Sequence, residues 1–258
     1  MLSVSFSSND AIGHTWGPDS QEVFDVTLRS DVIMRDLLNY LDEKVGHGKY
    51  LLALTADHGV CRVPEISQAL GKDAGRLSIG KLQQAADEFL EAEFGGGGND
   101  KPRWIKSIAN GWVYLDEAKL SERGIELAQA EYSLRQWLLR QPGIFSVFTD
   151  IQLKSGVAKE DVLGQRVLRS YHAERSGNVL IILKPFWLPG DAETGTTHGS
   201  PFGYDSHVPL LVLGPQVTPG TRSERVSPLA IASIFAHALG MKPPADSDTP
   251  LPEGLFKE

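Results

Sequence analysis

Three features that would direct an interpretation are scarce or missing in this sequence. Its 258 residues include a single cysteine, Cys61, so no disulfide can form within the chain, and the compartment cannot be inferred from cysteine usage. The formal net charge is −8, which argues against nucleic acid as the main partner, and no nucleic-acid-binding surface is expected. No apolar run approaches the roughly 20 residues of a membrane span. These absences argue against disulfide-stabilised, nucleic-acid-binding and membrane-spanning proteins.

What is present is an ordinary globular composition, with 41% hydrophobic and 22% charged residues. This supplies enough apolar side chains for one large α/β domain or two small ones. The N-terminus lacks the regions of a signal peptide, and residues 2–6 are interpreted as a short strand. Since a protein rarely opens on a buried strand, we expect an upstream segment to be absent; the alternative is a compact natural start.

Three short apolar runs, at 50–55, 178–183 and 208–213, predict strands buried on both faces. Apolar residues at helical spacing predict a helix over about 20–41, and Ser227-Pro228 opens a last helix near the C-terminus. We find no internal repeat. This succession of strands and helices indicates an α/β fold with a mostly parallel central sheet flanked by helices.

The pattern changes between residues 61 and 177. It predicts amphipathic helices over 82–94 and 127–139, a glycine-rich tether at 95–98, and a hairpin over 104–115 that turns at Asn110-Gly111. We therefore predict three parts. A first part of the core covers 1–60, an inserted cap subdomain covers 61–177, and the last part of the core covers 178–258.

Residues able to bind a metal ion are concentrated in three loops. The first carries Asp10 and His14, the second Asp57 and His58, and the third His198. Aspartate and histidine together suit Zn²⁺, because a carboxylate neutralises the dication and imidazole supplies a softer nitrogen. Asp57 and His58 directly follow a predicted strand, and open α/β sheets bind ligands at the carboxyl ends of their strands. Singly, each motif is weak, since an Asp-x-x-x-His pair, an Asp-His turn or a loop histidine often occurs without a metal.

The three motifs in this order resemble the alkaline phosphatase superfamily. The residues that carry the likeness are Asp-x-x-x-His-x-x-Gly-Pro from Asp10, Ala-Asp-His-Gly from Ala56, Thr-His-Gly-Ser from Thr197 and His-Val-Pro-Leu from His207. The likeness is greatest to the bacterial phosphate-irrepressible alkaline phosphatases, near the type I phosphodiesterase and nucleotide pyrophosphatase group. It runs over the whole chain, and it implies an alkaline-phosphatase-like fold.

The resemblance implies a site for two zinc ions. Asp10, His14 and His198 would hold one ion, and Asp57 and His58 would hold part of the other. In the family, the second ion is also bound by an aspartate and by a threonine or serine nucleophile near the N-terminus. Only nine residues precede Asp10. We therefore expect the nucleophile to be missing from this sequence, and this chain to hold about one zinc firmly.

The implied function is phosphomonoesterase activity on a small-molecule phosphate ester, impaired here by the missing segment. The alternatives are a phosphodiesterase or nucleotide pyrophosphatase of the same superfamily, a non-catalytic metal-binding fragment, and an unrelated metalloprotein. His207 is open to three interpretations: a ligand, an outer hydrogen-bond partner of a ligand, or an ordinary histidine at a strand edge. By resemblance, the periplasm or the cell exterior is the expected location.

Overall fold

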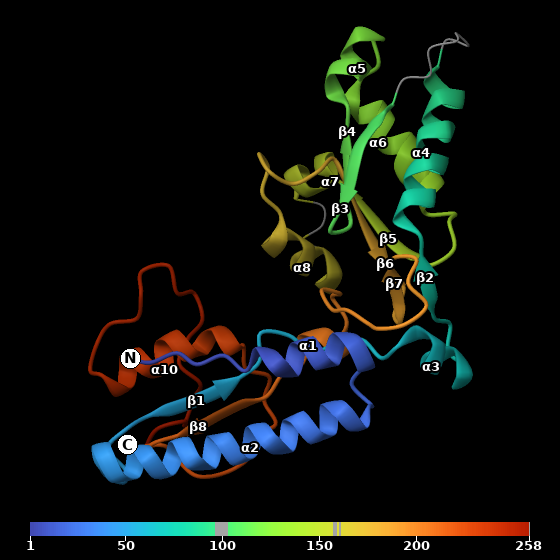
Figure 1. Ribbon diagram of the computed structural model, residues 1–258. Helices are drawn as coiled ribbons and strands as arrows, with labels where there is room; N and C mark the ends of the chain where they lie inside the picture. The colour runs from blue at the N-terminus through green and yellow to red at the C-terminus, as the bar shows by residue number, and fades with distance from the viewer. Residues whose placement is uncertain (96–102, 157–158, 160, 258) are drawn as a thin grey trace.

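The structure is a computed structural model that describes residues 1–95, 103–156, 159 and 161–257, arranged in two lobes (Figure 1). The lower lobe in Figure 1 holds both ends of the chain, and the upper lobe holds most of the segment predicted as the cap. Most of the predicted tether at 95–98 lies outside the described residues.

The helices of the described residues are α1 (Ser7–Trp16), α2 (Gln21–Leu41), α3 (Pro64–Ala69), α4 (Ile79–Phe94), α5 (Glu117–Glu122), α6 (Leu127–Leu138), α7 (Asp150–Ser155), α8 (Val162–Ser170), α9 (Gly203–Ser206) and α10 (Ile231–Ala238), with a π-helical turn η1 (Asp42–Gly46) and a 3-10 turn η3 (Pro228–Ala230). The strands are β1 (Leu52–Thr55), β2 (Gly75–Leu77), β3 (Ile105–Ala109), β4 (Trp112–Leu115), β5 (Ile144–Thr149), β6 (Val179–Leu183), β7 (Trp187–Pro189) and β8 (Leu210–Leu213).

The upper lobe is built on a four-stranded antiparallel sheet in the order β3-β4-β6-β5. The predicted hairpin forms β3 and β4, and its turn residues Asn110 and Gly111 have φ angles of 50° and 80°, the positive values that a two-residue type I′ turn requires. The predicted helices at 82–94 and 127–139 are confirmed as α4 and α6. They cover one face of the sheet, and α7 and α8 cover the other.

Strand β6 corrects one interpretation of the sequence. Residues 178–183 were expected in the core, but β6 pairs with β4 and β5 of the upper lobe. Val179 and Ile181 join the cluster under α4 and α6, whereas Leu180 joins the cluster under α7 and α8. An antiparallel strand between two helical layers thus has the same continuous apolar run as a parallel strand. The division at 1–60, 61–177 and 178–258 otherwise stays a prediction.

The lower lobe corrects the expected strand direction. Strands β1 and β8 form an antiparallel pair, in which Leu52 lies opposite Leu213 and Thr55 opposite Leu210. Within the described residues the parallel pairing is that of β2 with β7. The α/β class is confirmed, since helices cover mixed sheets, but the mostly parallel sheet is wrong for the part of the fold described.

The N-terminal strand predicted at 2–6 is also wrong. These residues belong to no strand, and their side chains are mostly exposed. A strand needs a neighbouring strand to accept and donate its backbone hydrogen bonds. Residues 2–6 have no such neighbour among the described residues, so they do not form one. The segment expected to be a loop, 7–20, instead begins with helix α1, which places Asp10 and His14 one turn apart on the same helix.

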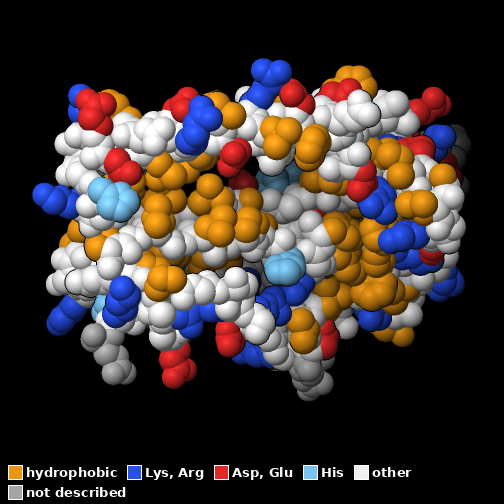
Figure 2. Space-filling view, turned by 90° about the horizontal axis from the view of Figure 1, so that it is seen from below, with side chains coloured by type: hydrophobic (Ala, Val, Ile, Leu, Met, Phe, Trp, Pro, Cys, Tyr) orange, Lys and Arg blue, Asp and Glu red, His pale blue; other side chains and the backbone are white. Residues whose placement is uncertain are grey.

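Helix α2 packs differently from the helices of the upper lobe. Its 21 residues follow Ser20, whose side chain caps Val23 N, and none of the 21 is buried. Large apolar side chains remain exposed along α2 and on β8, among them Phe24, Leu28 and Leu211. Figure 2, seen from below, shows hydrophobic side chains gathered on this side of the molecule around hollows in its surface. No described helix is long and apolar enough to cross a membrane.

Candidate metal centre

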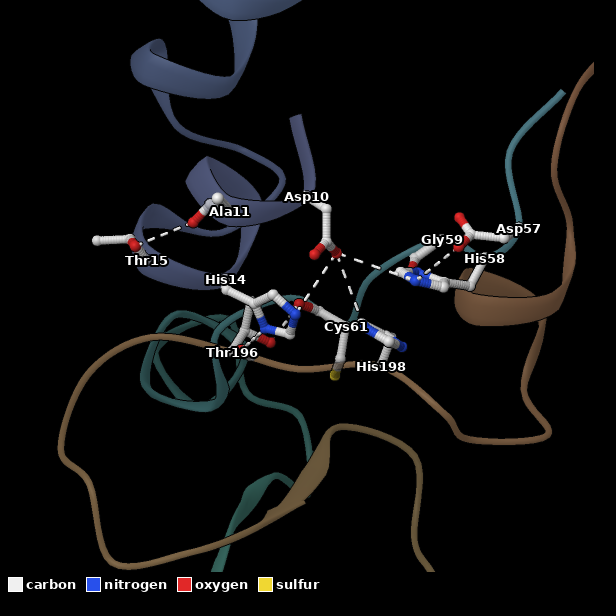
Figure 3. Close-up of polar contacts among 10 residues, drawn as sticks. All are labelled: Asp10, Ala11, His14, Thr15, Asp57, His58, Gly59, Cys61, Thr196 and His198. Carbon is white, nitrogen blue, oxygen red and sulfur yellow. Dashed lines mark hydrogen bonds and ion pairs between the residues drawn. The ribbon is translucent and has the colours of Figure 1, made fainter. Parts of the chain in front are cut away.

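Three of the predicted ligands, all histidines, approach the carboxylate of a fourth, Asp10. Its Oδ1 atom lies 3.4 Å from His14 Nε2, 3.7 Å from His198 Nε2 and 3.9 Å from His58 Nε2. The dashed lines of Figure 3 show these three approaches from three separate segments of the chain. The potential ligand atoms of Asp10, His14 and His198 all lie within 4.8 Å of one another. The three side chains that the resemblance assigns to one ion therefore lie together, and their role as ligands stays a prediction.

The backbone joins the His198 loop to helix α1. Thr196 N donates to the carbonyl of His14 at 2.8 Å, and the Thr196 hydroxyl donates to the carbonyl of Cys61 at 2.7 Å. Cys61 N in turn donates to the carbonyl of Thr197 at 3.2 Å. These bonds hold the residues just before His198 against the first two loops, although Thr196 is 182 residues from His14 and 135 residues from Cys61 in the sequence.

In two of the imidazoles, a hydrogen bond engages Nδ1, and Nε2 is the nitrogen that faces the centre. His14 Nδ1–H donates to the carbonyl of Thr196 at 2.8 Å, and His58 Nδ1–H donates to the carbonyl of Gly59 at 2.9 Å. Each ring therefore carries a proton on Nδ1 and directs Nε2 toward Asp10. Metal-binding histidines use this same arrangement, in which a backbone carbonyl fixes the tautomer and the ring orientation.

The imidazoles are crowded. The ring centroids of His58 and His198 are 3.3 Å apart with an angle of 14° between the planes, and those of His14 and His198 are 5.0 Å apart. Burial lowers the pKa of His198, and the neighbouring His58 and His14 lower it further. For His198 these effects favour the neutral ring, the form in which imidazole binds a metal.

Asp57 and His207 are placed differently from these four residues. The side chain of Asp57 is 91% exposed, and its Oδ2 atom lies 3.6 Å from His58 Nε2. It therefore lies beside the cluster, near the start of the loop after β1, and faces solvent. His207 is exposed at the end of α9 and is not among the grouped ligand atoms.

One buried acid beside the centre is not among the predicted ligands. Asp205, in α9, is only 4% exposed. Its carboxylate accepts from Ser200 N at 2.7 Å, and its backbone carbonyl accepts from Gly59 N at 2.7 Å. Sequence reasoning missed it because an aspartate in a polar loop gives no signal of its burial.

Two hydroxyl groups on the segments that carry the ligands are engaged in structural bonds. Thr196 Oγ1 donates to Cys61 O, and Thr55 Oγ1 donates to Pro209 O at 2.7 Å. A pocket of about 550 Å³ lies in the other lobe, where Arg76, Lys81 and Trp137 contribute to its lining, and none of the predicted ligands lines it. The candidate centre is thus a partly exposed surface site separate from that pocket.

The family model for type I phosphodiesterase / nucleotide pyrophosphatase matches residues 1–205. The chain belongs to this family. It is also 35% identical over 246 residues to alkaline phosphatase PhoV of Synechococcus elongatus, covering 95% of this chain and 43% of that protein. A protein of Myroides odoratus named calcium-transporting ATPase is 31% identical, over 98% of this chain and 46% of its own length.

A solved structure supports the same relationship. The crystal structure of alkaline phosphatase PafA is similar to this chain with a TM-score of 0.86 at 29% identity, covering 97% of this chain and 46% of that one. PafA of Elizabethkingia meningoseptica is 31% identical in sequence over 244 residues, 95% of this chain and 43% of that protein. The fold is therefore alkaline-phosphatase-like, and the protein belongs to a hydrolase family. The chain spans somewhat less than half the length of these relatives.

Proposed function

We propose that this chain contributes the metal-binding part of a phosphate ester hydrolase, with phosphomonoesters as the preferred substrates and zinc as the metal. The observation that carries the proposal is the approach of three imidazole Nε2 atoms to one carboxylate oxygen, at 3.4 to 3.9 Å. The names of the relatives PhoV and PafA, both alkaline phosphatases, support the choice of substrate class.

The donor set fits zinc. One carboxylate and neutral imidazoles are ligands that Zn²⁺ prefers, and carbonyl partners already fix the rings of His14 and His58. In the proposed assignment, Asp10, His14 and His198 hold one ion, and Asp57 and His58 supply two ligands to a second. A bound zinc ion would polarise a phosphoryl oxygen and lower the pKa of its water toward about 7. The carboxylates of Asp10 and Asp57 would offset only part of the charge of the two ions, and the positive charge that remains would attract an anionic ester.

Among the described residues, two hydroxyl groups beside the proposed centre lack the partner that would activate a nucleophile. The hydroxyls of Thr55 and Thr196 donate to backbone carbonyls, and no base adjoins them to take a proton. Two ligands also hold a second zinc weakly, since structural and catalytic zinc sites use three or four protein ligands. We therefore propose that this chain alone binds about one zinc firmly, at Asp10, His14 and His198, and that the ion would supply an activated water for slow ester hydrolysis.

Two alternatives keep specific support. The matching family model is named for phosphodiesterases and nucleotide pyrophosphatases, so a diester is the second candidate substrate. The engagement of the nearby hydroxyls favours the other alternative, a non-catalytic metal-binding fragment. The periplasm or the cell exterior stays the expected location on the resemblance alone.

The test combines metal counting with two assays. The purified chain is loaded with zinc, the metal per chain is counted, and hydrolysis of p-nitrophenyl phosphate is compared with that of bis-p-nitrophenyl phosphate. We expect about one tightly held zinc, and slow hydrolysis in which the monoester is the better substrate. Preference for the diester would favour the phosphodiesterase, and zinc binding without any hydrolysis would favour the non-catalytic fragment.

Replacement of single histidines tests the assignment of residues. We expect His14→Ala and His198→Ala each to weaken zinc binding by at least about tenfold, because each removes one of three ligands. His47→Ala is the matched control, since the His47 side chain is 91% exposed and contacts only Asp42. Full zinc binding in both site variants would show that the assignment is wrong.

A further inference from the structure

Asp205 is a buried carboxylate that the assignment of ligands does not use. Its side chain accepts a hydrogen bond from Ser200 N through Oδ2, at 2.7 Å. The other oxygen, Oδ1, is buried and has no hydrogen-bond partner among the described residues. An ionised oxygen in that state is costly, so a buried carboxylate of this kind normally has a further partner in the functional state of the protein.

Asp205 is hydrogen-bonded to the loop that carries His198 and to the loop that carries His58. Ser200, the donor to its carboxylate, lies two residues after His198. Gly59, the donor to its backbone carbonyl, directly follows His58. One residue of α9 therefore holds the two segments that carry the stacked imidazoles.

His198 differs from the other two histidines in one respect. His14 and His58 each donate Nδ1–H to a carbonyl, whereas His198 has no hydrogen-bonded partner for its second nitrogen in the part of the chain described. A metal-binding histidine almost always donates that N–H to a carboxylate, a carbonyl or water.

We propose that Asp205 is the positioning residue for His198. Its Oδ2 atom holds the loop through the Ser200 amide, and its Oδ1 atom accepts from His198 Nδ1–H when Nε2 binds the metal. The inference rests on the proposed function, since it assumes that His198 is a ligand. It adds to that function the group that sets the tautomer and orientation of the third imidazole.

The first test measures zinc affinity in Asp205→Asn, by competition with a chromophoric chelator. Asparagine keeps the size and an acceptor for the Ser200 amide but removes the charge, so we expect affinity to fall 10- to 100-fold. Glu193→Gln is the matched control, because Glu193 is an exposed acid of the same loop, and it should leave the affinity unchanged. Thermal unfolding of the metal-free proteins checks that both variants fold like the parent.

The second test needs no variant at the site. In the zinc-loaded protein, nitrogen-15 NMR of the histidine rings should show His198 protonated at Nδ1, with a proton that exchanges slowly with water. If Asp205 has a purely structural role, the His198 ring proton of the parent protein should exchange quickly with water. In the first test, the metal-free Asp205→Asn protein should then melt at a lower temperature than the parent. Fast exchange of that proton, or unchanged affinity in Asp205→Asn, would overturn this inference while leaving the metal site in place. Failure of the parent protein to bind zinc would overturn the proposed function as well.

Discussion

Gly59 marks the closest approach of backbone in the candidate centre. A Cβ atom at this position would lie 2.1 Å from the carbonyl oxygen of Tyr204. Since that atom belongs to the backbone, Gly59→Ala must push α9 away from the His58 loop. We expect a loss of about 1–3 kcal/mol of unfolding free energy and weaker zinc binding, measured by chemical denaturation and metal competition. Gly80→Ala is the control, because no atom lies within 4 Å of its Cβ; equal behaviour of the two variants would contradict the prediction.

Glu131 is a buried acid in α6 whose ionisation opposes folding. It is 1% exposed, one of its oxygens has no hydrogen-bond partner in the described residues, and burial raises its pKa to about 7. The ordinary pKa of a glutamate is 4.5. Between pH 4.5 and about pH 7, Glu131 loses its proton in the unfolded chain and keeps it in the folded chain. This group therefore lowers stability progressively as pH rises through that window, by up to about 3 kcal/mol, with no further effect above it.

Replacement of the acid should remove that pH dependence. In Glu131→Gln, the amide oxygen can still accept from Ile151 N, so we expect a flatter stability profile and a protein more stable than the parent at pH 8. The measurement is denaturant unfolding at a series of pH values. Glu122→Gln, at an exposed position, should leave the profile unchanged. A parent protein whose stability does not fall between pH 5 and pH 7 would contradict the assignment.

At the scale of elements, we expect a leucine-to-alanine substitution to lower the unfolding free energy strongly in α6 and only slightly in α2. Leu134 of α6 is fully buried in the upper lobe, whereas Leu28 of α2 is 51% exposed. Leu134→Ala removes a side chain from a closed core and should cost about 2–5 kcal/mol. Leu28→Ala removes little contact and should stay within about 0.5 kcal/mol. Calorimetry of both variants tests this pair; a large loss at Leu28 would show that α2 is covered in solution.

At the scale of the whole molecule, the lower lobe exposes more apolar surface than a stable monomer usually leaves uncovered. Exposed large side chains lie along α2 and β8 and on both sides of α10 in the sequence, and within the described residues β1 pairs with β8 alone. Such a face and such a strand edge favour association. We expect the purified chain to bind a hydrophobic dye and to self-associate at about 10–100 μM, although its net charge of −8 opposes this.

Charged substitutions test the origin of that association. Leu211 and Leu213 of β8 are 58% and 51% exposed, so Leu211→Lys with Leu213→Lys removes apolar surface without opening a core. The double variant should bind less dye and sediment closer to the monomer. Phe145→Lys, at an exposed position in the upper lobe, serves as the comparison. A parent chain that is monodisperse and monomeric over the whole concentration range would show that the exposed face is not adhesive.

The sequence by itself determined the elements whose signals are local. Helices α4 and α6 follow from apolar spacing, the β3–β4 turn follows from Asn110-Gly111, and the metal-binding residue types follow from three short motifs. These features depend on residues a few positions apart, so a single sequence is enough to predict them.

Only the tertiary structure decided which strands are neighbours and which polar groups are buried. The apolar run at 178–183 indicated burial on both faces, but periodicity carries no information on the direction or identity of the partner strand, so β6 was assigned to the wrong sheet. The role of Asp205 was equally invisible, because its burial results from loops 140 residues apart in the chain meeting at Gly59 and Ser200. Burial and pairing are properties of non-local contacts, and these exist only once the chain has folded.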